Sequence, residues 1–211
     1  MHRSPVHTKW QSPEAGRHYV GARWASARRA GRDPRLVATL LDACVEPTRE
    51  LALLDAPCGT GRLCASLAMR GRYVGLDVSL PMLSEAVRAS AASAWLHGDV
   101  TQLPFRDRAF DVVVCCRLLH HLAEAEQLER VLAELVRVSS RYLIASFWDR
   151  QSLPAWRRAL LPSARPARRV ARSRAELRAF VEHAGASVIA FEHSFRFVSR
   201  QTFFLARRRE R

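Results

Sequence analysis

The stretch Leu51–Leu63, LALLDAPCGTGRL, decides the fold of this chain. An apolar run ends at Asp55, and the chain then turns through Gly59 and Gly61 into an amphipathic segment. This pattern predicts a strand, a glycine turn and a helix start, because glycine permits a sharp reversal and lets a ligand approach the backbone without meeting a Cβ atom. The free amides at the helix start then face any group bound there. Similar turns also join strands to helices where no ligand binds. Whether this turn binds a ligand therefore depends on the sequence that follows it.

A second acid, Asp77, ends the apolar stretch Tyr73–Asp77, which we predict to be the next parallel strand. An acid roughly 20 residues beyond a glycine turn, at the end of the second strand of a βαβ unit, is placed to accept both hydroxyls of a ribose. The dinucleotide fingerprint has a third glycine where this chain has Cys64, which disfavours a pyrophosphate. S-adenosylmethionine has a ribose and no phosphate, and Asp55 or nearby carbonyls can receive its ammonium group.

Two further segments extend this pattern. Asp99 lies in HGDVTQLPF after a predicted strand at Ala94–Leu96, and FDVVVCC from Phe110 to Cys116 is a predicted fourth strand. Together, DAPCGTG, VGLDVSLPML, GDVTQLPF and FDVVVCCRLLHHL resemble the class I S-adenosylmethionine-dependent methyltransferases, especially the branch related to ubiquinone and menaquinone biosynthesis methyltransferases. The resemblance covers about residues 48–147.

The resemblance implies an α/β fold, a doubly wound Rossmann-like sheet of seven strands whose last strand runs antiparallel. It also implies a cofactor site in which Asp55, Gly59 and Gly61 cradle the methionine part and Asp77 holds the ribose. Met82 is expected to pack on the adenine, and Asp99 with the Val100 amide to read the adenine amino group. The remaining expected cofactor-binding residues are Ala56, Cys58, Val78, Cys116, Arg117 and Tyr19.

His120 and His121 follow the fourth strand in CRLLHHL, from which this fold commonly reaches the methyl group. Methyl transfer from a sulfonium mainly requires the protein to align and desolvate the nucleophile. A phenol or alcohol must also lose a proton, and a histidine can accept it near pH 7. Adjacent residues at a helix start point about 100 degrees apart, so we expect at most one to face the reaction. The resemblance favours His120, as a base or as polar lining, and leaves His121 to packing or capping.

The chain is predicted to have an N-terminal arm and cofactor-covering helices over residues 1–47, and the Rossmann-like domain over 48–211. Related methyltransferases often close the pocket with an aromatic N-terminal helix, so Tyr19 is a candidate lid residue, or a side chain that only docks the helix. Ser139–Ser140 replaces a Pro-Gly-Gly turn found in many relatives. The other expected elements are strands at 141–147, 186–193 and 201–207 and helices at 34–44, 61–70, 80–91, 124–136 and 174–184, with N-caps at Ser79 and Ser173.

A basic, proline-containing segment at about 149–174 leaves the sheet at the carboxyl end of the fifth strand, where open α/β folds bind ligands. We therefore expect it to cover the acceptor as a lid. Its arginines, including Arg165, Arg168, Arg169 and Arg172, either attract an anionic acceptor or are solvated surface charge.

The composition limits the size of the core, the kind of partner and the location that we expect. The 211 residues are 48% hydrophobic, which suits one sizeable core. The net charge of +14 favours anionic partners, although Lys9 is the only lysine and such an arginine bias also arises from a GC-rich genome. The N-terminus has no apolar signal region and no stretch is long enough to span a membrane, so we expect a cytoplasmic protein. The five cysteines include no CxxC pair, and no metal site is predicted.

The functional classes follow in order of preference. The first is a methyltransferase for a small or lipid-like acceptor. The second is an RNA or nucleotide methyltransferase, favoured by the arginines and the C-terminal RRRER but lacking the Asn-Pro-Pro-Tyr and catalytic cysteine motifs of many base methyltransferases. A non-catalytic cofactor-binding or scaffold protein and an NAD-linked oxidoreductase are the remaining alternatives. The sequence does not indicate the oligomeric state or whether oxygen, nitrogen or carbon is methylated.

Overall fold

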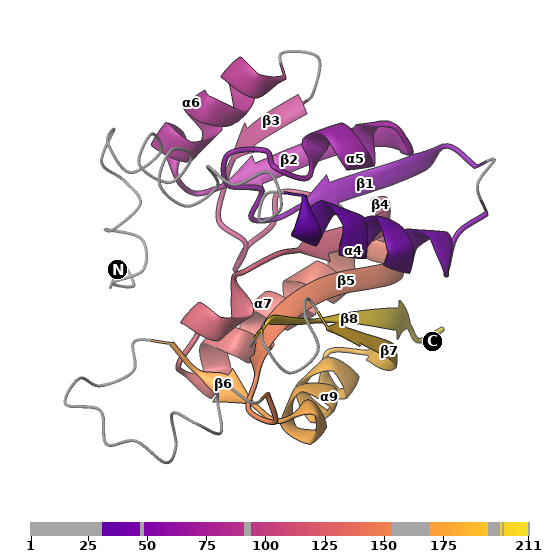
Figure 1. The fold of residues 1–211 in the computed structure, drawn as a ribbon, viewed down its shortest axis with the longest axis vertical. Helices are drawn as coiled ribbons and strands as arrows, with labels where there is room; N and C mark the ends of the chain where they lie inside the picture. The colour runs from indigo at the N-terminus through magenta and orange to yellow at the C-terminus, as the bar shows by residue number, and fades with distance from the viewer. Residues whose placement is uncertain are drawn as a thin grey trace.

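The computed structural model describes residues 31–46, 49–90, 94–152, 169–193, 199 and 201–210. A single sheet forms the middle of the molecule, and helices cover both of its faces (Figure 1). None of the helices in the described part of the chain is long and apolar enough to cross a membrane. The strands are β1 (Leu51–Asp55), β2 (Gly71–Asp77), β3 (Ala94–His97), β4 (Phe110–Cys115), β5 (Ser139–Asp149), β6 (Ala171–Arg172), β7 (Ala186–His193) and β8 (Gln201–Arg208). The helices are α4 (Arg32–Asp42), α5 (Cys64–Ala68), α6 (Leu80–Ala89), the 3₁₀ helix η2 (Leu119–His121), α7 (Ala125–Val138) and α9 (Arg174–His183).

The strand order is β3-β2-β1-β4-β5-β8-β7. The first five strands in this order pair in parallel, whereas β8 runs antiparallel to both β5 and β7. The predicted seven-stranded sheet with an antiparallel last strand is therefore confirmed, with the two-residue β6 as an addition that pairs with β5. The order reverses between β1 and β4, which is where open α/β sheets form a ligand crevice at the carboxyl ends of their strands.

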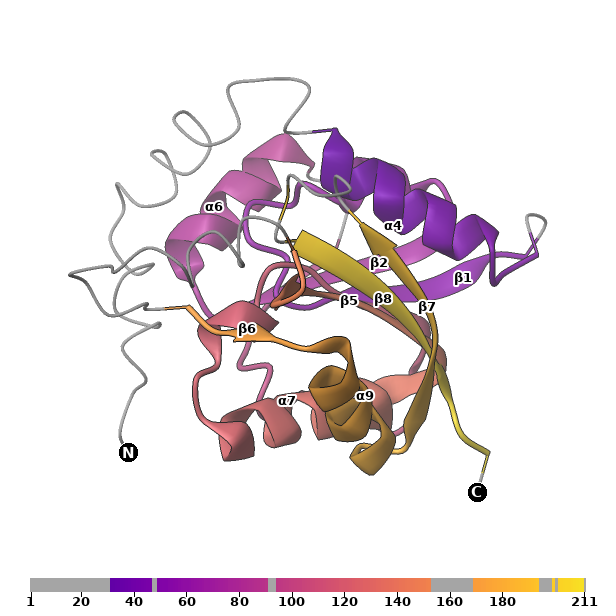
Figure 2. The same cartoon turned by 60° about the horizontal axis from the view of Figure 1, so that its bottom comes forward.

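Two layers of helices bury the two faces of the sheet. On β4, Val113 and Cys115 face the layer of α7 and α9, whereas Val112 and Val114 face the layer of α4 and α5. Figure 2 shows α4 on one side of the sheet and α7 and α9 on the other. All four β4 side chains are fully buried. Burial on both faces explains why this strand is a continuous apolar run rather than an alternating one.

Most element bounds agree with the prediction to within two residues, and β7 agrees at both ends. The predicted N-caps are confirmed: Ser79 accepts the Met82 N–H, and Ser173 forms a capping box with Glu176. The start of α5 was predicted wrongly, because the helix begins at Cys64 and not at Gly61. Gly61 has φ of +74°, a left-handed conformation that extends the turn before the helix forms.

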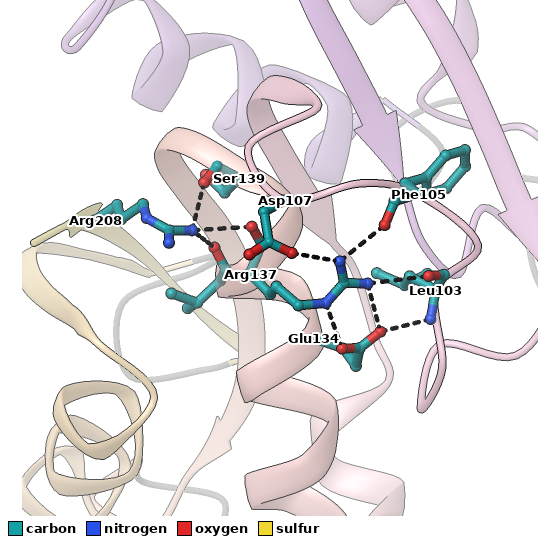
Figure 3. A network of polar contacts seen from close by, with 8 residues as sticks. Leu103, Phe105, Asp107, Glu134, Arg137, Ser139 and Arg208 are labelled. Atoms are coloured by element: carbon teal, nitrogen blue, oxygen red, sulfur yellow. Dashed lines mark hydrogen bonds and ion pairs between the residues drawn. The ribbon is translucent and has the colours of Figure 1, made fainter. Parts of the chain in front are cut away.

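The connection from α7 to β5 needs no glycine turn, because β5 begins at Ser139 directly after α7 ends. Carbonyls at a helix C-terminus lack helical partners. Here Arg208 of β8 is the hydrogen-bond donor. Its Nη1 donates to the carbonyls of Arg137 and Ser139, each at 2.9 Å, and to that of Val136 (Figure 3). An arginine distant in the sequence thus caps the carbonyls at the end of α7.

Arg137 ties the loop after β3 to the end of α7. Its guanidinium bonds Glu134 at 2.6 Å and Asp107 at 2.8 Å, and donates to the carbonyls of Leu103 and Phe105 at 3.0 and 2.8 Å (Figure 3). Glu134 in turn accepts the Leu103 N–H at 2.7 Å. These bonds fix the loop that follows Asp99 on one side of the candidate site.

Candidate active site

A pocket lies at the carboxyl ends of the parallel strands, walled by the segments that follow β1, β2, β3 and β4. The predicted residues in its wall are Asp55, Cys58, Gly59, Asp77, Val78, Met82, Asp99, Val100, Cys116, Arg117, His120 and His121. Four loops that are distant in the sequence therefore meet at one site. Wall residues that sequence analysis missed include Arg62, Ser79, Leu118, Leu122 and Val131.

Two of the predicted residues that the structure describes, Ala56 and Gly61, stand apart from this wall. Ala56 is fully buried beneath it, and its N–H donates to the Val114 carbonyl at 2.9 Å. Gly61 lies under Trp95, whose ring atom Cη2 would be 2.7 Å from a Cβ added at this position. Tyr19 lies outside the described residues, as does most of the segment predicted to be a lid. Ala56 and Gly61 thus support the loop after β1 without lining the pocket.

Asp77 links the glycine turn to the start of α6. Its Oδ2 accepts the Gly59 N–H and its Oδ1 accepts the Ser79 N–H, both at 2.8 Å. A carboxylate oxygen can accept hydrogen bonds from more than one donor. The acid therefore sets the shape of the pocket as well as lining it.

Asp55 is a buried acid at the end of β1. The Tyr73 hydroxyl donates to its Oδ2 at 3.0 Å, while its Oδ1 is buried and has no hydrogen-bond partner among the described residues. Burial raises the pKa of Asp55 to about 7, an effect that the Tyr73 hydrogen bond and the charge of Arg62 partly oppose. A buried carboxylate oxygen without a partner is costly, so this position favours a ligand that brings a cationic donor.

Asp99 and Met82 lie on the walls that follow β3 and β2. Asp99 Oδ1 accepts the Thr101 N–H at 2.8 Å, which shapes the turn after β3. Met82, in the first turn of α6, is buried and contributes an apolar surface to the pocket. An acid and an apolar side chain on neighbouring walls of one pocket suit a flat, polar-edged ring such as adenine.

Asp33 anchors the wall after β4, and sequence analysis missed it. This fully buried residue of α4 accepts from Arg117 Nε at 2.6 Å and from Arg62 Nη2 at 3.2 Å. Arg117 has φ of +65°, and its N–H donates to Ser146 Oγ at 2.8 Å. An acid at a helix start beside Pro34 has the pattern of an ordinary helix cap, so no local signal marked it.

The cysteines of the site are neutral thiols. Burial raises the pKa of Cys116 to about 12, and the nearby Asp33 carboxylate adds to the shift. Burial likewise raises the pKa of Cys58 well above its usual range. Because the thiolate is the nucleophile, neither residue is suited to attack a substrate near neutral pH.

His120 and His121 lie on η2, a 3₁₀ helix, rather than on the α-helix start that was predicted. The His120 side chain is buried and stacks on Trp148, with ring centroids 4.7 Å apart and planes 3° from parallel. The two imidazole centroids are 4.3 Å apart, and both residues line the pocket. The pair therefore forms one continuous edge of the site.

The arginines of the predicted lid that the structure describes are engaged within the protein. Arg172 donates to three backbone carbonyls, Arg174 pairs with Asp149 at 2.9 Å, and Arg150 pairs with Glu176 at 3.3 Å. Arg165 and Arg168 lie outside the described residues. The Arg172 guanidinium therefore serves the backbone, and the attraction of an anionic acceptor by these arginines stays a prediction.

Comparison with known proteins agrees with this geometry. Residues 53–141, which carry the glycine turn and the acids, match the model of a methyltransferase domain. A magnesium protoporphyrin IX methyltransferase from Synechocystis, solved with bound S-adenosylhomocysteine, superposes with a TM-score of 0.72 over 85% of this chain and 84% of its own, at 21% identity. The chain has a Rossmann-like methyltransferase fold.

Curated relatives match part of the chain. An uncharacterized methyltransferase of Mycobacterium tuberculosis is 35% identical over 111 residues, which is 51% of this chain and 56% of that protein. A malonyl-[acyl-carrier protein] O-methyltransferase of Pectobacterium atrosepticum is 37% identical over 90 residues, which is 42% of this chain and 34% of that enzyme. The chain thus spans about half, or less, of the length of the curated relatives it matches.

Proposed function

We propose that the chain is an S-adenosylmethionine-dependent methyltransferase that acts on a small-molecule or lipid-like acceptor. The observation that carries the proposal is the placement of Asp55 and Asp77 on either side of the glycine turn in one pocket. The matched methyltransferase domain and the methyltransferase fold support it. Within class I, the four sequence motifs favour the branch related to ubiquinone and menaquinone biosynthesis methyltransferases.

The polar groups of the pocket fit S-adenosylmethionine. The partnerless Oδ1 of Asp55 suits the ammonium of the methionine part, and Asp77 suits the ribose hydroxyls. Asp99 and Met82 would hold the adenine. When bound, the cofactor supplies an electrophilic methyl group on a sulfonium. The residues of the chain bind it, orient it and exclude water.

The acceptor side of the pocket supports a small or lipid-like acceptor. Leu118, Leu122 and Val131 give it apolar surface, and His120 and His121 give it a polar edge. We propose that His120 removes the proton of an acceptor hydroxyl, with Trp148 holding the imidazole plane. One curated relative is named a malonyl-[acyl-carrier protein] O-methyltransferase and one structural neighbour a magnesium protoporphyrin IX methyltransferase, and both names agree with an acceptor other than RNA.

Isothermal titration calorimetry with S-adenosylhomocysteine tests the cofactor assignment directly. We expect saturable binding by the wild-type protein, and no competition from NADH. Binding of NADH in place of S-adenosylhomocysteine would instead identify the oxidoreductase alternative.

A second experiment tests the acceptor class. The protein is incubated with S-adenosylmethionine that carries a deuterated methyl group, together with a cell extract divided into RNA and low-molecular-mass fractions. We expect label in the low-molecular-mass fraction. Label confined to RNA would refute the acceptor assignment while leaving the cofactor assignment intact.

A further inference from the structure

Arg172 of β6 is a buried arginine whose guanidinium reaches the segment that carries the two histidines. It is only 8% exposed. It donates to the carbonyl oxygens of Leu122 at 2.7 Å, Ala123 at 3.3 Å and Leu119 at 3.4 Å. These carbonyls belong to η2 and to the residues directly after it. One side chain, 50 residues away in the sequence from Leu122, therefore gathers the carbonyls at the end of this helix.

The chemistry of the contact makes arginine the appropriate residue. A short 3₁₀ helix leaves its last carbonyls without helical partners, and burying such groups unpaired is unfavourable. A guanidinium has five N–H donors in a rigid plane and keeps its proton in proteins, whereas an ammonium is a compact point charge. Burial removes water from the guanidinium and lowers the pKa of Arg172. The three carbonyl oxygens accept hydrogen bonds that water would otherwise accept.

The residues just before Arg172 contact the same segment. The Val170 N–H donates to the His120 carbonyl at 2.9 Å. The Arg169 guanidinium lies 5.2 Å from the centroid of a Trp148 ring, and Trp148 stacks on the His120 imidazole. Residues 169–172 thus hold both the backbone and, through Trp148, the side chain of His120.

We propose that Arg172 is a positioning residue that holds η2 in place, so that His120 and His121 form the acceptor edge of the pocket. The proposal rests on the proposed function, since it assigns these histidines to the acceptor side. The chain that returns from the predicted lid would then determine the geometry of the reacting edge without touching substrate.

Nuclear magnetic resonance of histidine-labelled protein tests this without knowledge of the acceptor. His120→Gln and His121→Gln assign the two ring signals. Arg172→Met removes the donors while keeping an apolar stem, and Arg172→Lys is the conservative variant. Arg209→Met is the matched control, because Arg209 is an exposed arginine whose side chain contacts Glu182 and Ser187, outside both η2 and residues 169–172.

We expect Arg172→Met to shift the ring signals of both histidines, Arg172→Lys to restore part of the effect, and Arg209→Met to leave the signals unchanged. Unchanged His120 and His121 signals in a folded Arg172→Met protein would overturn the proposal, because a merely stabilising residue lowers the melting temperature without moving these rings. If Arg172→Met does not fold, Arg172→Lys carries the same comparison. Binding of S-adenosylhomocysteine is measured in parallel, and its absence from the wild-type protein would refute the proposed function separately.

Discussion

Asp77 Oδ2 accepts the backbone N–H of Gly59 at 2.8 Å, so the acid predicted to hold a ribose also holds the glycine turn. Its other oxygen fixes the start of α6 through Ser79. The proposed ribose-binding residue and the support of the loop are therefore the same side chain. Changes at this position are expected to affect both binding and stability.

Asp77→Ala should weaken S-adenosylhomocysteine binding by about 1.5–3 kcal/mol, the range for hydrogen bonds to a charged group. It should also lower the melting temperature, because the Gly59 and Ser79 amides lose their acceptor. Calorimetry and thermal denaturation measure the two effects. Asp42→Ala, which alters an exposed acid paired with Arg70, is the control and should leave binding unchanged. Equal affinity for wild type and Asp77→Ala would rule out the ribose assignment.

Asp55 should make stability depend on pH. Burial raises the pKa of Asp55 to about 7, so the folded protein holds a proton that the unfolded chain releases at lower pH. The resulting stabilisation is complete below the unfolded pKa of about 4 and is lost as pH rises through the folded value. The slope should not exceed about 1.4 kcal/mol per pH unit. Urea denaturation of wild type and Asp55→Asn from pH 4 to 8 measures it, and parallel curves for the two proteins would contradict the assignment.

The same ionisation should govern cofactor binding. An ammonium near Oδ1 favours the carboxylate, so binding must release the proton that Asp55 holds below about pH 7. S-adenosylhomocysteine affinity should therefore rise between pH 6 and 8, by at most about tenfold per unit. Calorimetry in buffers of different ionisation enthalpy detects the released proton directly. No proton release by the wild-type protein would show that Asp55 does not meet the ammonium.

Gly61→Ala should destabilise the protein more than Gly185→Ala. Both glycines have positive φ, which costs an alanine about 1–2 kcal/mol. At Gly61 the new Cβ also meets Trp95 at 2.7 Å and Ala86 at 3.2 Å, whereas at Gly185 nothing lies within 4 Å. Overpacking should add about 1–3 kcal/mol at Gly61 alone. Chemical denaturation measures the difference, and equal losses at both sites would show that Trp95 moves aside freely.

Asp33→Asn should be strongly destabilising, by about 3–5 kcal/mol, because it leaves the guanidiniums of Arg62 and Arg117 beside a neutral partner in a buried setting. Asp42→Asn, in an exposed pair with Arg70, should cost only about 0–1 kcal/mol. Guanidinium denaturation compares the two variants. A small effect for Asp33→Asn would mean that water or another group readily replaces the carboxylate.

His120→Ala should lower kcat by roughly 10²–10⁴-fold if the residue is the general base of the proposed reaction. His183→Ala, an exposed histidine at the end of α9, is the control and should leave turnover unchanged. Steady-state kinetics with the acceptor found by methyl labelling makes the comparison. A loss confined to KM would mean that His120 lines the pocket without transferring a proton.

Elements whose signals are local were largely predictable. The glycine turn after Asp55 and the apolar run of β4 predicted a parallel α/β sheet. Ser79 and Ser173 predicted the starts of the helices that follow them. In each case the signal lies within a few residues of the structure it specifies. The convergence of Asp55, Asp77 and Asp99 was predictable as well, because the carboxyl ends of parallel strands meet at one edge of the sheet.

Contacts between distant segments were decided only by the tertiary structure. Asp33 accepts from Arg117 across 84 residues, Arg208 donates to the carbonyls at the end of α7, and Arg172 donates to those at the end of η2. In the sequence these arginines are indistinguishable from the many others that give the chain its charge of +14. Which arginine faces solvent and which one is buried against carbonyls or a carboxylate depends on the packing of strands and helices far apart in the chain. The sequence by itself determined the sheet and the acids at its edge, because the hydrophobic period and the spacing of the motifs are local properties. The partners that hold the site in shape were decided only by the tertiary structure, because a hydrogen bond depends on distance in space.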